Sequence, residues 1–536
     1  MEEFDYVVLG GGSGGCTVAG RLSEDDARSV LLLEAGGDGT SWVVKVPMAA
    51  AISVPTAINN WALQTVPQRG LDGRRGYQPR GRGLGGSSAI NAMVYTRGHA
   101  TDYDDWAAAG ADGWAFADVL PYFKRAENNE QFELLDPAFH GQGGPLNVAA
   151  LRTDNPFHGY FADAVREAGL PWNADFNGAV QDGLGAYQVT QKGGERCSAA
   201  RGYIHPHLGK RRNLAVVCRA RGRRILFDGR RAVGVEYERD GRVHVARARH
   251  EVILSAGALH TPQILMLSGV GDPAELRRTG IALVHELPGV GRNLQDHPDF
   301  VFSFESATTD LVGLSLRGAG RLLREISRFR TQRRGMLTTN YAELGGFLRT
   351  RPDLTRPDIQ LHFTVAIVDD HARALFRTFR LPHGFSLHMC LLRPRSRGRV
   401  TLASADPRAA PLIDPDFLGD PRDVDDMVAG FRLARRLLDA PALARRTTRD
   451  LHTAGISSDE EIRAVLRQRV DTIYHPVGTC RMGTDPDAVV DPQLRVHGIE
   501  GLRIVDASVM PTLVGGNTNA PTIMIGEKAA DLIRGA

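Results

Sequence analysis

The first 36 residues place the strongest constraint on the fold of this chain. An apolar run at residues 4–9 leads into the glycine-rich segment 10–15, and a second apolar run at residues 29–33 ends in Glu34. This order predicts a strand, a glycine turn, a helix that begins near Ser13, and a second strand.

The spacing of Gly10, Gly12 and Gly15 is typical of a dinucleotide-binding turn. One glycine makes the tight turn, one lets the backbone approach a pyrophosphate, and one packs the helix on the strand. The phosphates would lie on the N–H groups of the first helical turn. Glu34 follows Gly15 by 19 residues, where a carboxylate accepts hydrogen bonds from an adenosine ribose and repels a 2′-phosphate. We therefore expect FAD or NAD, and not NADP.

Length and charge limit the possible classes of protein. A chain of 536 residues is too long for one compact core, so we expect two domains. The 65 basic residues are nearly balanced by 62 acidic residues. The arginine clusters have acidic residues nearby and no interleaved aromatic residues, so we expect no nucleic-acid partner.

The five cysteines are odd in number and far apart, and they include no C-x-x-C pair. This pattern indicates neither a disulfide framework nor a zinc site, and we expect no metal. The chain goes straight from Met1-Glu2-Glu3 into the first strand, which leaves no room for a signal peptide, and no apolar run is long enough to span a membrane. We expect a cytoplasmic protein, with peripheral membrane attachment left open.

Changes in sequence pattern predict how the two domains divide the chain. We assign residues 1–155, 197–305 and 472–536 to a dinucleotide-binding domain, and residues 156–196 and 306–471 to a substrate-binding domain.

Local signals predict several further elements. Short apolar runs separated by turn residues favour an antiparallel meander over residues 214–245, followed by a buried strand at 251–255. Helical patterns occur at residues 316–329, 421–439, 458–468 and 522–533.

Residues 80–98 form a second informative stretch, in which glycines and serines run into an apolar segment. Such a loop lets the backbone lie flat against a ligand, while Ser87 or Ser88 caps a helix that begins near Ser88. A merely flexible loop is the alternative interpretation.

Four segments together resemble the glucose-methanol-choline (GMC) flavoprotein oxidoreductases, and especially their bacterial alcohol and choline dehydrogenase-like members. The resemblance covers nearly the whole chain. The segments are residues 10–15 with Glu34, residues 80–98, residues 257–271, and residues 475–480 followed by 517–521.

The resemblance implies an α/β protein with a Rossmann-like FAD-binding domain and a substrate domain built on an antiparallel sheet covered by helices. It also implies that an alcohol is oxidised to an aldehyde or carbonyl by hydride transfer to flavin N5, with reoxidation by oxygen or a quinone-like acceptor. Covalent members of the family carry a histidine in the segment that matches Ser88-Ala89-Ile90. This chain has Ala89, so we expect non-covalent FAD.

Carried over position by position, the resemblance places the cofactor in contact with twenty residues. The pyrophosphate would contact Gly10, Gly12, Ser13, Gly14 and Gly15, and the adenosine half Glu34, Ala35, Gly222, Ala256 and Gly257. The flavin half would contact Gly86, Ser87, Asn91, Ala92, Met93, Val94, Asp506, Ala507, Pro521 and Thr522.

An alcohol is a poor hydride donor until its hydroxyl proton leaves, so a base must lie beside the flavin. His475 matches the catalytic motif of the family, and the unperturbed pKa of histidine, about 6.5, suits this role. We expect Asn519 to be its partner and to donate to the substrate oxygen. His297 matches another family motif, for which we favour a structural role, and Asp299 would meet a cationic substrate in a choline-oxidising relative.

Two other functions remain open at this point. Some members of the family are hydroxynitrile lyases that keep FAD without net redox chemistry. A third hypothesis is that the chain is a nicotinamide-dependent dehydrogenase. Phe, Leu and His alternate through residues 300–470 without a readable code for the pocket walls. Because no acidic cluster is visible, we favour an apolar or aromatic primary alcohol as the substrate.

Overall fold

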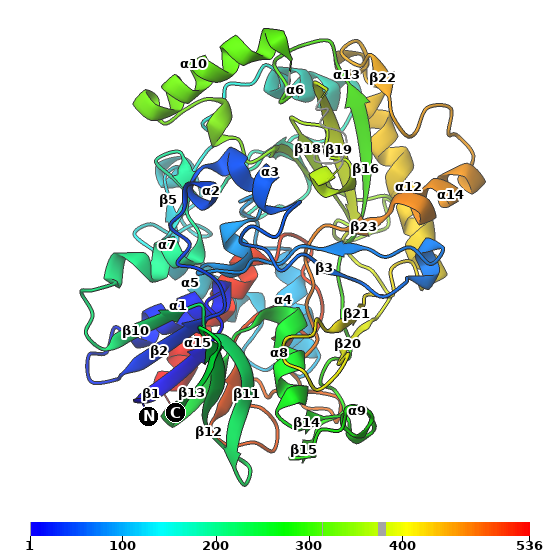
Figure 1. Ribbon diagram of the computed structural model, residues 1–536. Coiled ribbons are helices and arrows are strands. Elements are labelled where there is room, and N and C mark those ends of the chain that lie inside the picture. The colour runs from blue at the N-terminus through cyan, green and yellow to red at the C-terminus, as the bar shows by residue number, and fades with distance from the viewer. Residues whose placement is uncertain (1, 314, 374–381, 536) are drawn as a thin grey trace.

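The computed structural model describes residues 2–313, 315–373 and 382–535. In Figure 1 the two termini lie close together in the lower part of the molecule, with the first sheet around them. The second sheet and its helices lie in the upper part.

The first sheet forms around the predicted glycine turn. β1 (Glu2–Leu9), α1 (Ser13–Leu22) and β2 (Val30–Glu34) follow in the expected order. β1 pairs in parallel with β2 and with β13 (Arg242–Leu254), and β10 (Leu214–Cys218) pairs in parallel with β2. Every residue of β2 is buried, as is typical of a parallel strand covered on both faces.

An antiparallel hairpin and one short strand complete this sheet. β11 (Arg221–Asp228) and β12 (Arg231–Arg239) are antiparallel, β12 is antiparallel to β13, and β24 (Leu502–Ile504) is parallel to the end of β13. The expected meander over residues 214–245 is therefore correct for β11 to β13 and wrong for β10, which lies at the opposite edge. The strand expected at residues 251–255 is the end of β13, because no turn interrupts that strand.

The second sheet is antiparallel, as expected. Its strands, in spatial order, are β17 (Ala342–Leu348), β18 (Ile359–Thr364), β19 (Gly384–Leu391), β16 (Pro298–Glu305) and β22 (Arg449–Asp450), and β23 (Asp471–Thr472) also pairs with β16. Helices α6 (Phe157–Glu167), α12 (Pro421–Leu438) and α14 (Asp459–Arg469) contribute to the apolar core on one side of this sheet.

One expected domain boundary is displaced. Residues 298–305 were assigned to the first domain, but they form β16, which pairs with β19 in the second sheet. The strand follows His297 without a linker, so no change of composition marks the boundary.

The loop over residues 80–98 contains less helix than expected. It holds only the 3-10 turn η3 (Gly86–Ala89), after which the chain becomes irregular. Met93 adopts a positive φ of 56°, which an α-helix does not allow.

The remaining elements cover the two sheets or join them. The helices are α2 (Trp42–Lys45), α3 (Ala50–Ser53), α4 (Ala100–Ala108), α5 (Phe116–Ala126), α7 (Ala199–Tyr203), α8 (Gly257–Leu267), α9 (Pro273–Thr279), α10 (Leu316–Gln332), α13 (Pro441–Ala444) and α15 (Asn519–Arg534). The short strands are β3 (Leu63–Gln64), β4 (Tyr77–Gln78), β5 (Glu127–Asn129), β6 (Leu146–Val148), β7 (Gly183–Ala186), β8 (Gln191–Lys192), β9 (Glu195–Arg196), β14 (Val270–Gly271), β15 (His285–Glu286), β20 (Arg399–Thr401) and β21 (Leu412–Asp414). Among the described residues, no helix combines the length and apolar character needed to cross a bilayer.

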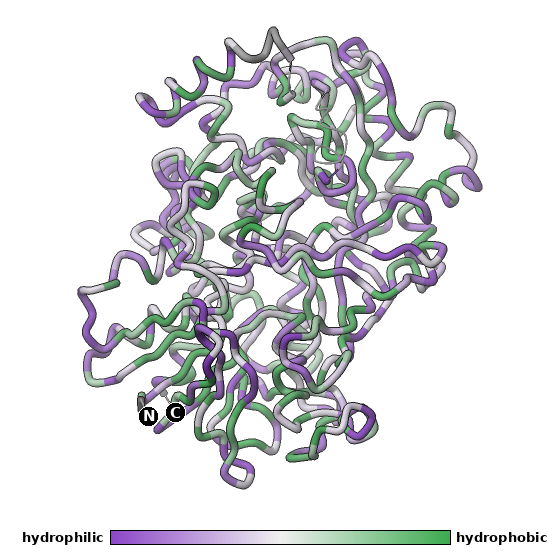
Figure 2. Tube along the Cα trace, in the orientation of Figure 1, coloured by the Kyte–Doolittle hydropathy of each residue, from purple (hydrophilic) through white to green (hydrophobic). Residues whose placement is uncertain are grey.

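The last helix, α15, packs closely against α1, and both lie behind the first sheet in Figure 1. Figure 2 shows hydrophobic residues along the strands of this sheet and hydrophilic residues at its outer turns. Gly526 permits the close helix approach, because a Cβ at this position would lie 2.7 Å from Cβ of Thr17 and 3.0 Å from the carbonyl oxygen of Gly14.

Gly526→Ala should lower the free energy of unfolding by about 1–3 kcal/mol, because the added methyl group overpacks the contact between the two helices. Gly159→Ala is the matched control: Gly159 is also helical, a Cβ there meets nothing within 4 Å, and alanine should stabilise slightly. Thermal unfolding of both variants without FAD measures the difference. Equal stability of the two variants would contradict the helix contact.

Candidate active site

A cavity of about 350 Å³ reaches from the first sheet to the second. It begins at Leu9 and Leu33, at the carboxyl ends of β1 and β2, and extends to His362 and His388. In open α/β sheets, ligands bind in the crevice outside the carboxyl ends of the strands. The cavity is therefore the candidate site for both a cofactor and a substrate.

Most residues expected at the cofactor line this cavity. They are Gly10, Gly12, Ser13, Gly14, Glu34, Ala35, Gly86, Ser87, Asn91, Ala92, Met93, Val94, Gly222, Ala256, Gly257, Asp506, Ala507 and Thr522.

Gly15 and Pro521 are not among the residues that line the cavity. A Cβ on Gly15 would lie 1.9 Å from the carbonyl oxygen of Gly10, so Gly15 serves the packing of α1 on the turn. Pro521 is buried within the first turn of α15.

The N-terminus of α1 fits a phosphate group. Its N-cap residue, Gly12, makes no side-chain capping hydrogen bond, so the N–H groups of the first turn remain available to a ligand. A Cβ on Gly12 would meet only the carbonyl oxygen of Ser255, at 3.9 Å. The backbone is therefore open toward the cavity here.

Glu34 fits the adenosine ribose. Its carboxylate is buried and accepts backbone N–H bonds from Gly11 at 2.9 Å and from Gly36 at 2.7 Å. These two bonds fix the carboxylate at the cavity wall and leave further acceptor sites on its oxygens. Burial raises the pKa of Glu34, and the backbone hydrogen bonds oppose that rise.

The loop that would border the flavin is held from behind by Arg196. This buried guanidinium donates through Nη1 to the carbonyl oxygens of Ser88 and Asn91, at 3.1 and 2.7 Å. Burial lowers the pKa of Arg196 to about 9. The loop is therefore positioned by a cation that does not itself line the cavity.

Asp506 closes the opposite side of the cofactor region. Its Oδ2 accepts from the backbone N–H of Gly257 at 2.8 Å and from Oγ1 of Thr261 at 2.6 Å. Burial raises the pKa of Asp506. The carboxylate thus ties the end of β24 to the start of α8.

His475 lies in the cavity wall, after β23. Its Nε2 is 3.1 Å from Nδ2 of Asn517, and its Nδ1 is 3.0 Å from Nδ1 of His297. The backbone N–H of His475 donates to Oδ1 of Asp296 at 2.8 Å. Burial lowers the pKa of His475 well below its ordinary value, and His297 and Arg80 lower it further.

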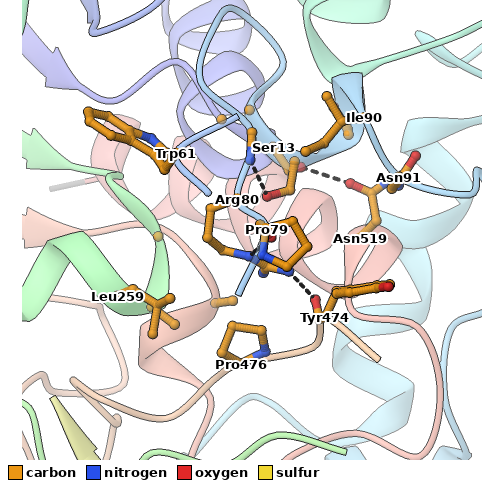
Figure 3. A pocket seen from close by; sticks show the side chains of 18 of the residues that line it. Ser13, Trp61, Pro79, Arg80, Ile90, Asn91, Leu259, Tyr474, Pro476 and Asn519 are labelled. Atoms are coloured by element: carbon orange, nitrogen blue, oxygen red, sulfur yellow. Dashed lines mark hydrogen bonds between the residues drawn. The ribbon is translucent and has the colours of Figure 1, made fainter. Parts of the chain in front are cut away.

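The neighbour of His475 is Asn517, and not the Asn519 expected from the sequence. Asn519 is the first residue of α15, and its Oδ1 accepts a hydrogen bond from Oγ of Ser13 at 2.8 Å (Figure 3). Asn517 lies in the preceding loop, from which its amide reaches the imidazole. Both asparagines line the cavity.

Arg80 is a further residue that sequence reasoning missed. It lines the cavity, and its Nη2 donates to the carbonyl oxygen of Tyr474 at 2.7 Å (Figure 3). Burial lowers the pKa of Arg80 to about 10, so the side chain stays cationic at neutral pH. Its place directly before the glycine loop at residue 81 was the signal available in the sequence.

His297 and Asp299 lie behind the wall instead of in it. His297 is fully buried, and burial lowers its pKa to about 3, so it is a neutral partner of His475. Asp299 contacts His388, which does line the cavity. The sequence did not reveal His362 and His388, because the facing direction of β18 and β19 cannot be read from it.

Comparisons with known proteins agree on one family. The N-terminal GMC oxidoreductase model matches residues 4–299 and the C-terminal model residues 394–526. An alcohol dehydrogenase [acceptor] of Pseudomonas putida is 46% identical over 533 residues, covering 99% of this chain and 95% of the relative. Human mitochondrial choline dehydrogenase is 44% identical over 547 residues, covering 100% and 90%.

Solved structures share the same architecture. Pyridoxine 4-oxidase from Mesorbium loti has a TM-score of 0.88 at 30% identity and covers 99% of each chain. A formate oxidase has a TM-score of 0.91 at 29% identity, covering 100% of this chain and 98% of that chain.

Glu34→Gln should weaken FAD binding about 10- to 100-fold, because the amide loses the negative charge and presents only one acceptor oxygen. Titration of the deflavinated protein with FAD, followed by flavin fluorescence, measures the dissociation constant. Glu286→Gln, at an exposed position on β15, is the control. Equal dissociation constants for the two variants would remove Glu34 from the site.

Proposed function

The chain belongs to the GMC oxidoreductase family, and from this premise we propose that it oxidises a primary alcohol with an apolar or aromatic body, using His475 as the base. It is an FAD-dependent oxidoreductase that acts on CH–OH donors. The observation that carries the residue assignment is the contact of His475 with Asn517 at the cavity wall, with 3.1 Å between Nε2 and Nδ2.

The amide orientation of Asn517 supports His475 as a proton acceptor. Oδ1 of Asn517 accepts from Oγ1 of Thr96 at 3.2 Å and from Nε2 of Gln360 at 3.1 Å, which turns Nδ2 toward His475. An amide nitrogen only donates, so Nε2 of His475 carries a lone pair and Nδ1 carries the proton. That proton is donated to Nδ1 of His297. A neutral imidazole with its lone pair at the cavity is the state that a general base needs.

When bound, FAD supplies the hydride acceptor. His475 takes the hydroxyl proton of the substrate onto Nε2, which raises the electron density on the substrate oxygen. Nδ2 of Asn517 then donates to that oxygen and stabilises its alkoxide character. Arg80, a cation on the same wall, favours negative charge in this region.

The proposed substrate class rests on the family and on the cavity. By their printed names, one relative oxidises alcohols and another oxidises choline, which is itself an alcohol. Tyr341, Val368 and Ile473 give the cavity an apolar section. We further propose that FAD is bound non-covalently, since Ala89 provides no attachment group, and that oxygen or a quinone-like compound is the electron acceptor. Bleaching of the flavin by an alcohol under anaerobic conditions separates oxidation from hydroxynitrile cleavage, which needs no net redox change.

His475→Ala should slow flavin reduction by about 10²- to 10⁴-fold, the contribution of general base catalysis. Asn517→Ala should lower the rate about 10²-fold by removing one donor to the developing alkoxide. Anaerobic rapid mixing with an alcohol measures this step apart from reoxidation. Asn519→Ala is the discriminating control and should slow reduction less than Asn517→Ala. A normal rate in His475→Ala would overturn the assignment.

The rate of flavin reduction should be independent of pH around neutrality and should fall only below pH 6.5. The pKa of His475 is lowered, so the imidazole stays neutral, and able to accept a proton, at pH values where an ordinary histidine is already protonated. Rapid-mixing rates between about pH 5 and 9 test this expectation. An acid limb with its midpoint at or above pH 6.5 would contradict it, and His475→Ala should lack the limb.

A further inference from the structure

The two faces of the second sheet differ in chemistry. On β18 and β19, Phe363, Leu387 and Met389 pack into the apolar core on the helix side. The alternate residues His362 and His388 line the cavity, and they are direct cross-strand partners. The alternation of Phe, Leu and His therefore places apolar side chains on the helix-covered face of the sheet and the two histidines on the face toward the cavity.

Asp299 lies behind His388 on the neighbouring strand. Its Oδ2 is 2.6 Å from Nδ1 of His388, and both residues are buried, with exposed fractions of 4% and 8%. Oδ1 of Asp299 has no hydrogen-bond partner among the described residues. Removing a carboxylate from water costs free energy that this one partner offsets only in part. A buried pair of this kind at a cavity wall is a candidate functional position.

His362 adds a second polar group to the same wall. Its exposed fraction is 4%, and its Nδ1 has no hydrogen-bond partner within the described part of the chain. Burial lowers the pKa of His362 well below the ordinary value, so the ring is neutral. The ring therefore adds a neutral polar group to the wall beside His388.

We propose that Asp299 and His388 form a subsite for a second hydroxyl group of the substrate, so that the enzyme prefers alcohols that carry another hydroxyl, such as hydroxybenzyl alcohols and terminal diols. This inference rests on the proposed function. His388 contacts the second hydroxyl, and Asp299 is a positioning residue that fixes the imidazole through Nδ1.

The choice of a hydroxyl group follows from the hydrogen-bond inventory. With Nδ1–H donated to Asp299, Nε2 of His388 accepts when the ring is neutral and donates when it is charged. A hydroxyl group serves both states, because it both donates and accepts. A quaternary ammonium group does neither, and His388 stands between the Asp299 carboxylate and the cavity.

The test compares matched alcohols on the FAD-loaded enzyme. The pairs are 4-hydroxybenzyl and 4-methoxybenzyl alcohol, butane-1,4-diol and butan-1-ol, and choline and 3,3-dimethylbutan-1-ol. The hydroxyl-bearing member of each of the first two pairs should have a kcat/KM about 10- to 100-fold higher, because the other member leaves a buried polar partner without its hydrogen bond. The third pair should show no preference for the cation.

Variants locate this preference at the subsite. His388→Leu and Asp299→Asn should abolish the preference for the hydroxyl-bearing member while changing kcat/KM for butan-1-ol and 4-methoxybenzyl alcohol by less than about threefold. A role in folding alone would lower all substrates together. His388→Gln keeps a polar side chain, and it should retain part of the preference if His388→Leu fails to fold.

His158→Leu is the matched control. Nε2 of His158 lies 2.6 Å from Oε2 of Glu343, so it is also an imidazole on a buried carboxylate, but His158 is not among the residues that line the cavity. Its substrate preference should equal that of the parent enzyme.

A binding measurement separates this inference from the proposed chemistry. In FAD-loaded His475→Ala, the dissociation constants of the same alcohol pairs are measured by perturbation of the flavin absorbance. If His475→Ala binds the hydroxylated alcohol preferentially but the flavin of the parent enzyme is not reduced by it, only the proposed function is overturned. Equal binding within each pair, a preference that persists in His388→Leu, or a tenfold preference for choline over its carbon isostere would overturn the subsite.

Discussion

The proposed catalytic geometry depends on how one amide, that of Asn517, is held. Thr96 comes from the loop after the glycine stretch, Gln360 from β18 of the second sheet, and His475 from the segment after β23. Gln360 belongs to the second sheet, whereas the loop that carries Thr96 borders the proposed cofactor region beside the first sheet. The amide is therefore oriented only when the two sheets are docked. A neutral imidazole with its lone pair toward the cavity is therefore a product of the tertiary fold.

The backbone around His475 carries strain that its neighbours compensate. Tyr474 has a positive φ of 77°, a region that costs a non-glycine residue about 1–3 kcal/mol. Its N–H donates to Oγ1 of Thr472 at 2.6 Å, and its carbonyl oxygen accepts from Arg80. The next N–H, of His475, donates to Asp296, whose pKa burial raises to about 6. Thr472, Arg80 and Asp296 thus hold the strained backbone that carries the imidazole.

Much of the fold was predictable because its signals are local. The glycine turn, Glu34 and the long helices each follow from patterns within one segment, whereas the antiparallel second sheet was expected from the family resemblance. The boundary before β16 was not predictable, because strand and preceding motif join without a linker. Asn517 and Asn519 are two residues apart in one motif, and only the start of α15 decides that Asn519 turns to Ser13. The polar wall at His362 and His388 needed knowledge of which sheet face meets the cavity.

Two helix N-termini place partial positive charge at the cavity. The N-cap of α1 is Gly12 and that of α15 is Thr518, neither makes a side-chain capping bond, and both residues line the cavity. Oγ of Ser13 joins the two helices through Oδ1 of Asn519. Each N-terminus carries a partial positive charge. The one at α1 suits phosphate groups, and the one at α15, close in the chain to Asn517, suits negative charge that develops during oxidation. The same packing that requires glycine at position 526 therefore also aligns these two positive ends on one cavity.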